Sequence, residues 1–197
     1  MNQPVNVLIV EDSEEHAELA LWTLRRGGFD AQSRRVQTAA ELEIALAEER
    51  WDAVISDFAM PGFNGMDALR IIRSTGLDIP FILVSGSIGE ETAVEAMKAG
   101  ANDYIMKASL ARLVPALERE LKQAQARAVS RQAQRDLVKS ESHFRTLIEQ
   151  AADGIFAADR AGNFILVNSR YCQMLGYEER ELLGLKVIET YPEDKRA

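Results

Sequence analysis

The amino-acid sequence predicts an α/β fold, namely a doubly wound, five-stranded parallel sheet. Continuous apolar runs such as Val5–Val10 and Ile79–Val84 are typical of strands that are buried on both faces. Between such runs, apolar residues recur at helical spacing, and glycines such as Gly76 and Gly100 end those segments. Repeated strand–helix units of this length indicate parallel strands with helices on both faces of one sheet.

The expected elements of this sheet follow one another from the N-terminus to about residue 125. Strands are expected at Val5–Val10, Ala31–Val36, Ala53–Ser56, Ile79–Val84 and Asp103–Met106. Helices are expected at Ser13–Arg26, after the capping box Thr38-Ala39-Ala40-Glu41, at Met66–Ser74, at Glu90–Ala99, and after Ser109 as an N-cap. The second strand has a polar sequence, which predicts a place at the edge of the sheet.

The helix after Ser109 is expected to continue beyond the sheet as one long amphipathic helix. Its apolar side chains repeat at spacings of three and four, which is a heptad seam. They are Val114, Leu117, Leu121, Ala124 and Ala128. The same register then meets Arg131 and Arg135. A two-stranded parallel coil, and hence a homodimer through the long helix, is the favoured interpretation, and a single solvated helix is the alternative.

A different pattern begins after residue 141. Helical spacing continues to Gly154, and a β-hairpin is then expected from Ile155–Ala158 and Phe164–Asn168 around a loop that contains glycine. Asn168 is predicted to cap a short helix at Ser169–Leu175.

Composition restricts the class of protein. The chain has 197 residues, of which 47% are hydrophobic and 27% charged, as in soluble globular proteins. Its net charge of -8 argues against nucleic acid as a direct partner, because phosphate backbones attract basic surfaces. The one cysteine, Cys172, allows no internal disulfide. No apolar stretch approaches the roughly 18 residues of a membrane span and no signal peptide is evident, so we expect no membrane partner and a cytoplasmic location.

Polar side chains stand where four of the expected strands end. The first strand runs into Glu11 and Asp12, the third into Asp57, the fourth into Ser85 and the fifth into Lys107. Because right-handed crossovers bring the carboxyl ends of parallel strands to one rim, we expect these side chains to meet. Three carboxylates suit a divalent metal such as Mg²⁺, and an ammonium with a hydroxyl suits the oxygens of a phosphoryl group.

Each of these groups taken alone has a plainer interpretation, since an acidic pair after a strand is often a solvated turn. Their arrangement at successive strand ends favours a site. An aspartate is a weak nucleophile unless a metal neutralises the crowded anions. We expect Glu11, Asp12 and Asp57 to bind Mg²⁺ together with a backbone carbonyl just beyond Asp57, that of Ala59.

Residues 1 to about 125 resemble a receiver domain of bacterial two-component response regulators. The matching segments, in order, are Leu-Ile-Val-Glu11-Asp12, Ile-Ser-Asp57-Phe-Ala-Met-Pro61-Gly62, Leu-Val-Ser85-Gly86 and Gly-Ala-Asn-Asp-Tyr104-Ile-Met-Lys107. The resemblance implies a flavodoxin-like sheet with the strand order 2-1-3-4-5.

The resemblance also implies roles for single residues. Asp57 would accept a phosphoryl group from a phosphohistidine of a partner histidine kinase or phosphotransfer protein. The acidic pair would bind Mg²⁺ as the cofactor, and Lys107 would contact the phosphoryl group. Ser85 with Tyr104 would form a conformational switch, and the change would pass through the long helix to the C-terminal region.

Two positions depart from the receiver pattern. Receivers commonly place a proline after the lysine, in a cis peptide, whereas this chain has Ala108. A cis bond before a residue other than proline costs about 2.5–4 kcal/mol, so a trans bond is expected. Ala59, two residues after Asp57, is too small to position a water molecule, so the resemblance leaves the lifetime of the phosphorylated state open.

Residues 141–197 resemble the start of a PAS sensory domain. The matching segments are Phe144-Arg-Thr-Leu-Ile148, Asp153-Gly-Ile-Phe-Ala-Ala-Asp159, Gly162-Asn, Val167-Asn168 and Met174-Leu-Gly176-Tyr177. The resemblance implies an incomplete PAS domain and the amino-terminal piece of a longer sensor protein. We therefore expect a receiver at 1–125, a helical linker at 126–142 and a PAS fragment at 143–197.

Other functions fit the sequence less well. An aspartate-nucleophile phosphatase needs a second acid two residues after the nucleophile, where Ala59 stands, so no turnover of an external substrate is expected. The sequence after His143 lacks the phosphoacceptor motif of a histidine kinase, so His143 and His16 are expected to be surface or partly buried helix residues. An interaction module that dimerises without phosphorylation stays open, and treatment with Mg²⁺ and a phosphoryl donor separates it from a phosphoacceptor.

Overall fold

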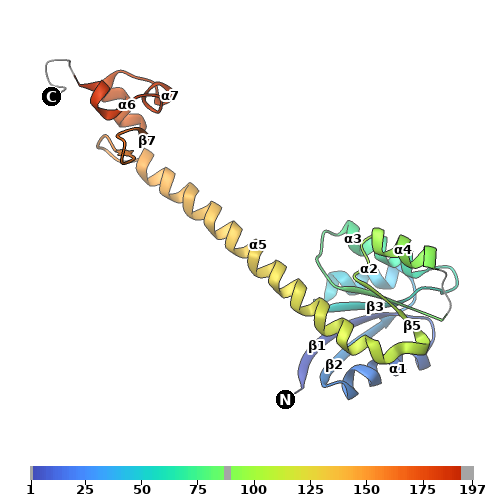
Figure 1. Cartoon of the computed structure of the whole chain (residues 1–197). Helices are drawn as coiled ribbons and strands as arrows, with labels where there is room; N and C mark the ends of the chain where they lie inside the picture. Colours follow the sequence, from blue (N-terminus) through green and yellow to red (C-terminus); the bar gives the residue numbers. More distant parts are fainter. Residues whose placement is uncertain (1, 87–89, 192–197) are drawn as a thin grey trace. The chain divides into compact units, whose positions relative to one another are not determined.

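The structure of the chain is a computed structural model that describes residues 2–86 and 90–191 (Figure 1). The chain forms two compact units, Met1–Val129 and Ser130–Ala197, each of which is described by itself. Among the described residues, none of the helices combines the length and the apolar character that crossing a membrane requires.

The first unit contains a five-stranded parallel sheet. Its strands are β1 (Gln3–Val10), β2 (Phe29–Val36), β3 (Ala53–Asp57), β4 (Phe81–Ser85) and β5 (Asp103–Met106). They are arranged in the order β2-β1-β3-β4-β5, and every neighbouring pair is parallel. The predicted fold class and the flavodoxin-like strand order are therefore confirmed. The polar strand β2 lies at an edge, as predicted.

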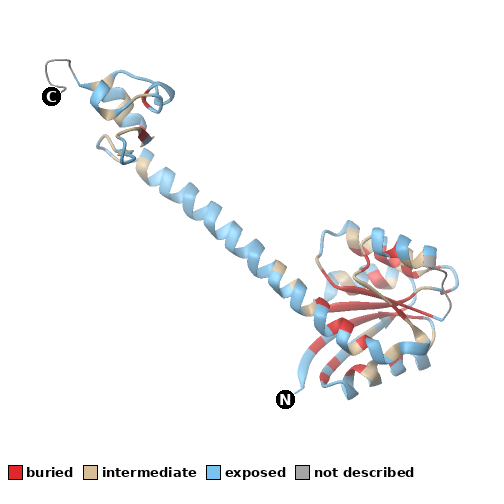
Figure 2. Cartoon of the chain, viewed as in Figure 1, coloured by how far each residue is buried: buried red, intermediate tan, exposed pale blue. Residues whose placement is uncertain are grey.

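Helices cover both faces of this sheet. They are α1 (Glu14–Arg26), α2 (Ala39–Glu48), α3 (Gly65–Ser74), α4 (Glu90–Lys98), the 3-10 helix η1 (Lys107–Arg112) and α5 (Leu113–Glu149). One core cluster joins the sheet to α2 and α3, and a second joins it to α1 and the start of α5. Alternation along β1 supplies both clusters, since Leu8 belongs to the first and Ile9 to the second. The strands β3 and β4 are buried along their whole length (Figure 2).

The helices α1 and α2 begin with side-chain caps, and the predicted capping box of α2 differs in one hydrogen bond. Ser13 caps α1, because its Oγ accepts a hydrogen bond from the backbone N–H of His16 at 3.4 Å. Thr38 caps α2 in the same way, accepting from the N–H of Glu41 at 3.2 Å. The Glu41 carboxylate accepts from the N–H of Gln37 at 2.8 Å, one residue earlier than a capping box requires.

The prediction that Ser109 caps the helix after β5 is wrong. Helical turns begin at Lys107, directly after β5, and Ser109 lies inside them with a non-helical φ of -121° and ψ of 34°. The α-helix α5 then begins at Leu113, which is fully buried. Packing of Leu113 on the sheet, rather than a side-chain cap, therefore accounts for where α5 starts. The described peptide bonds are all trans, including the one before Ala108, as expected.

The first turns of α5 pack against the sheet. Leu117 has no exposed surface, and Val114 and Leu121 pack against the same core cluster. Over these turns the apolar repeat is the face that α5 presents to its own sheet, so it is not a seam for a second helix. Farther along, Arg127 forms a bidentate ion pair with Asp78, with both N–H···O distances at 2.9 Å.

The second unit contains the end of α5 and a small antiparallel hairpin. After α5 come β6 (Phe156–Ala158), β7 (Phe164–Val167), α6 (Ser169–Leu175), α7 (Glu179–Leu182) and the 3-10 helix η2 (Val187–Thr190). The strands β6 and β7 pair antiparallel, so the predicted hairpin is confirmed. The bounds of α6 agree with the predicted helix.

The Asn168 side chain makes four hydrogen bonds to backbone groups of the second unit. It is fully buried, and its Oδ1 accepts from the backbone N–H groups of Ile155 and Tyr171, at 2.8 and 2.9 Å. Its Nδ2 donates to the carbonyls of Ile148 and Asp153, at 2.9 and 3.0 Å. The side chain therefore caps α6, as predicted, and also satisfies backbone groups at the end of α5 and before β6.

Candidate functional site

The register of the parallel strands brings the predicted site residues to one rim of the sheet. Asp57 is the last residue of β3 and lies opposite Val84, so Ser85 is next along β4. Ser85 in turn lies opposite Met106, the last residue of β5, so Lys107 follows directly after that strand. The side chains that follow three neighbouring strands are therefore close because of strand pairing, which the sequence pattern had indicated.

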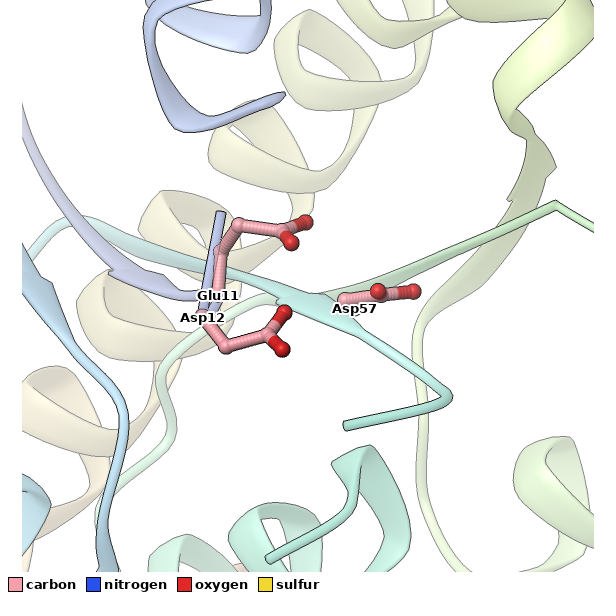
Figure 3. A group of neighbouring side chains, drawn as sticks. All are labelled: Glu11, Asp12 and Asp57. Carbon is pink, nitrogen blue, oxygen red and sulfur yellow. The ribbon is translucent and has the colours of Figure 1, made fainter. Parts of the chain in front are cut away.

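Three carboxylates meet at this rim. Glu11 and Asp12 follow β1, and their side chains converge with that of Asp57 from β3 (Figure 3). One carboxylate oxygen from each residue lies within 4.8 Å of the others. Glu11 and Asp57 are buried, with 5% and 7% of their surface exposed, whereas Asp12 is exposed. Burial raises the pKa of the Glu11 carboxyl above its usual 4.5, and the negative charge of Asp57 adds to the rise.

Lys107 supplies a positive charge to this cluster. Its Nζ lies 3.0 Å from Oδ2 of Asp57 and 3.3 Å from Oε2 of Glu11. The ammonium therefore bridges two of the three carboxylates and partly offsets the repulsion between them. The structure brings together the three predicted metal ligands and the predicted lysine.

Backbone contacts hold the acidic residues in place. Oδ1 of Asp57 accepts from the N–H of Ala59 at 3.4 Å. Nη1 of Arg35, near the end of β2, donates to the carbonyl oxygens of both Glu11 and Asp12 at 3.2 Å. Sequence reasoning missed Arg35, because nothing in the pattern of β2 shows that its side chain crosses to the loop after β1.

The hydroxyl of Ser85 has an unusual environment. Ser85 is 1% exposed, and within the described part of the chain its Oγ is buried and has no hydrogen-bond partner. A buried hydroxyl without a partner carries a desolvation cost, so such groups call for an explanation. Tyr104, the other predicted switch residue, is partly buried on β5, and its hydroxyl donates to Sδ of Met106 at 2.8 Å.

His16 also belongs to the site, which sequence reasoning missed. Its Nδ1 lies 3.0 Å from Nζ of Lys107 and 3.4 Å from Oε1 of Glu11. The side chain is 51% exposed, so the surface alternative of the predicted helix position is correct, but its contacts were not foreseen. Its position in the first turn of α1, which begins soon after Glu11 and Asp12, was the available signal.

A pocket of about 140 Å³ opens beside these groups. Its polar lining is Glu11, His16, Asp57 and Lys107. Its apolar lining comes from α1, β1, β3 and β4 and from Leu110 of η1. One side of the Asp57 carboxylate thus faces an accessible space with an apolar floor.

Comparison with protein families agrees with this geometry. Residues 7–118 match the response regulator receiver domain, and residues 142–197 match the PAS fold. The first match begins within β1 and covers the other four strands of the sheet, the acidic cluster, Ser85 and Lys107.

Named relatives share the first region. The chain is 32% identical over 104 residues to the response regulator MprA of Mycolicibacterium vanbaalenii, an alignment that covers 53% of this chain and 44% of the relative. It is 32% identical over 101 residues to the DNA-binding response regulator MtrA of Mycobacterium tuberculosis, covering 51% of this chain and 43% of the relative. The chain thus spans less than half the length of these relatives.

A solved structure shows the same fold. The signal receiver domain of a signal transduction histidine kinase from Syntrophus aciditrophicus is 30% identical, with a TM-score of 0.52, and the match covers 60% of this chain and 91% of that one. Fold, strand-end residues and family match therefore agree: the chain belongs to the response regulator receiver family and carries a PAS fold after its receiver domain.

Proposed function

We propose that this chain is a phosphoacceptor module of a bacterial two-component phosphorelay, in which Asp57 takes a phosphoryl group from a phosphohistidine. A cognate histidine kinase or phosphotransfer protein would be the donor. The observation that carries the proposal is the buried Asp57 carboxylate, which lies 3.0 Å from the ammonium of Lys107 and beside two further carboxylates.

The transfer places each group in a defined role. An oxygen of Asp57 attacks the phosphorus, a P–O bond forms, the P–N bond to the donor breaks, and its electron pair stays on the donor imidazole. Lys107 offers positive charge to the phosphoryl oxygens. The Ser85 hydroxyl, which has no partner within the described chain, is available to donate to one of them.

Mg²⁺ fits the residues at this rim. The donors are all oxygens, which this hard cation prefers, and the three carboxylates lie close enough together to share one ion. Glu11, Asp12, Asp57 and the backbone carbonyl of Ala59 would hold it. When bound, the ion would neutralise carboxylate charge that otherwise repels an incoming phosphoryl group.

The phosphorylated state would be reported to the rest of the chain by Ser85 and Tyr104. Ser85 ends β4 next to the site, and Tyr104 lies on β5 three residues before Lys107. The face formed by α4, β5 and α5 would respond to them. The long helix α5 would carry the change from a receiver at 1–125, through a linker at 126–142, to the PAS region at 143–197. No turnover of an external phosphate ester is proposed, because Ala59 offers no acid beside the nucleophile.

Intact-mass measurement tests the phosphoacceptor directly. In Mg²⁺ and a small phosphoryl donor the parent is expected to gain one phosphoryl group, and a chelator or Asp57→Asn should abolish the gain. The matched control is Asp30→Asn, which removes an exposed aspartate on β2 and should leave modification unchanged. A phosphoryl group that persists in Asp57→Asn would show that another residue is the acceptor. An unmodified parent would favour an interaction module that works without phosphorylation.

A further inference from the structure

The ammonium of Lys107 has three acceptors around it, and only two of them are carboxylates. Nζ lies 3.0 Å from Oδ2 of Asp57, 3.3 Å from Oε2 of Glu11 and 3.0 Å from Nδ1 of His16. A lysine ammonium has three N–H donors on a flexible stem, so its position depends on the acceptors that hold it. An imidazole that accepts at Nδ1 carries its own proton on Nε2.

The three acceptors differ in what else they are expected to bind. The oxygens of Glu11 and Asp57 belong to the acidic cluster and are the atoms that a hard cation takes. His16 offers a nitrogen and is not one of the three clustered carboxylates, although its Nδ1 also lies 3.4 Å from Oε1 of Glu11. When the carboxylates bind a cation and Asp57 carries a phosphoryl group, His16 is the acceptor that stays available to Lys107.

The backbone of His16 is well placed for this task. Its N–H donates to Oγ of Ser13, the N-cap of α1, so the first turn of the helix is closed around it. Ala17 and Ala20, on the following turn, are buried in the core cluster beneath α1. The imidazole therefore projects from an anchored helix turn toward the ammonium.

We propose that His16 is a positioning residue that holds the ammonium of Lys107 toward the group carried by Asp57. The inference rests on the proposed phosphoacceptor function and adds to it a residue of α1. His16 acts through Lys107. Its loss should therefore weaken the contact of Lys107 with a phosphoryl group and leave the affinity for Mg²⁺ unchanged.

Two substitutions distinguish the effect of the hydrogen-bond acceptor from the effect of side-chain volume. His16→Leu keeps much of the volume but has no acceptor, and His16→Asn places an oxygen near the position of Nδ1. The probe is the phosphoryl mimic beryllofluoride, titrated calorimetrically in saturating Mg²⁺. The Mg²⁺ affinity of each variant is measured without the mimic.

His16→Leu is expected to raise the Kd for beryllofluoride about tenfold, as the loss of one hydrogen bond to a charged group implies. His16→Asn should restore most of the affinity, and Mg²⁺ binding should be equal in all three proteins. Equal beryllofluoride affinity in His16→Leu and the parent would overturn the inference. So would equal weakening in the two variants, which would point to bulk rather than to an acceptor. A parent that binds no beryllofluoride and takes up no phosphoryl group would instead overturn the proposed function on which the inference rests.

Discussion

At the scale of single residues, two buried serines of the receiver sheet differ in what their hydroxyls bind. Ser56 on β3 donates from Oγ to the carbonyl of Asp57 at 3.0 Å. Ser85 on β4 is as deeply buried, yet its Oγ has no partner within the described part of the chain. The pair therefore offers a comparison of one satisfied and one unsatisfied hydroxyl in the same sheet.

We predict opposite effects of alanine at these two positions. Ser56→Ala should lower the free energy of unfolding by about 1 kcal/mol, because it removes a hydrogen bond and leaves a carbonyl without that donor. Ser85→Ala should leave it unchanged or raise it by up to about 1 kcal/mol, because no bond is lost. Urea denaturation measures both values. A Ser85→Ala protein that is less stable than Ser56→Ala would show that the Ser85 hydroxyl already has a partner.

The same Ser85→Ala variant also tests the switch. Asp57 should still be phosphorylated, but the amide NMR shifts of the α4–β5–α5 face should respond less than in the parent. Equal responses in the two proteins would contradict a relay through Ser85.

Most site residues could be predicted from sequence, because each stands at the end of an apolar run. Asp57, Ser85 and Lys107 were placed correctly by strand ends alone. Arg35 and His16 were not, because their roles depend on where a long or exposed side chain ends in space. That information lies in tertiary packing and is absent from the local pattern.

At the scale of elements, the end of α5 is tied to the start of α6 by one carboxylate. Glu149 accepts from the backbone N–H of Ser169 at 3.0 Å and from its hydroxyl. These two hydrogen bonds lower the pKa of the Glu149 carboxyl below its usual 4.5, and the bond from the hydroxyl has the larger effect. The charged form is thus the form that the folded second unit favours.

This contact predicts a pH dependence with a definite sign. A carboxyl whose pKa is lower in the folded state adds stability above its unfolded pKa, and that stability is lost as the pH falls through the folded value. The protection of the Ser169 amide against hydrogen exchange, relative to an unstructured peptide at the same pH, should therefore be full above pH 4.5 and decline below it. Glu149→Gln should remove the decline, and Glu141→Gln, on the exposed middle of α5, should not. An identical decline in all three proteins would assign it to another group.

The elements of the fold illustrate where sequence patterns succeed and fail. The hairpin and the Asn168 cap were predicted because turn glycines and caps are local signals. The start of α5 was misplaced at Ser109, since burial of Leu113 outweighs a side-chain cap. The apolar repeat through Leu117 predicts a coiled-coil seam from sequence, and the structure buries it on the sheet, because a face buried on a sheet and a face buried on a helix have the same spacing.

At the scale of the whole molecule, homodimerisation through the long helix stays a prediction. The residues of α5 that would form the contact, however, differ from those of the predicted seam. Leu117 is fully buried in the receiver core, so a charge there would destabilise the receiver and would not report on a dimer. Beyond the receiver, Leu137, Phe144 and Leu147 are each more than half exposed on α5. Their spacing of seven and three places them on one face of the helix.

We expect a homodimer that depends on this face. Leu137→Glu/Phe144→Glu should shift the mass measured by light scattering from dimer to monomer, because two charges per chain would lie in the apolar contact. The control Lys139→Glu/Arg145→Glu adds the same acidic groups at other exposed positions of the helix and should stay dimeric. A monomeric parent, or a dimer that survives the first pair of changes, would contradict the prediction.

The compactness of the acidic cluster has a consequence for how the receiver responds to ionic strength. Its three carboxylates have one ammonium among them, and their oxygens approach within 4.8 Å of one another. The Debye length in physiological salt is about 8 Å, which is longer than that separation. Dissolved salt therefore weakens the long-range attraction of a cation toward the site, yet leaves most of the repulsion inside it. Beyond what Lys107 offsets, that repulsion is relieved by a positive charge bound within the cluster, such as a metal ion or a proton.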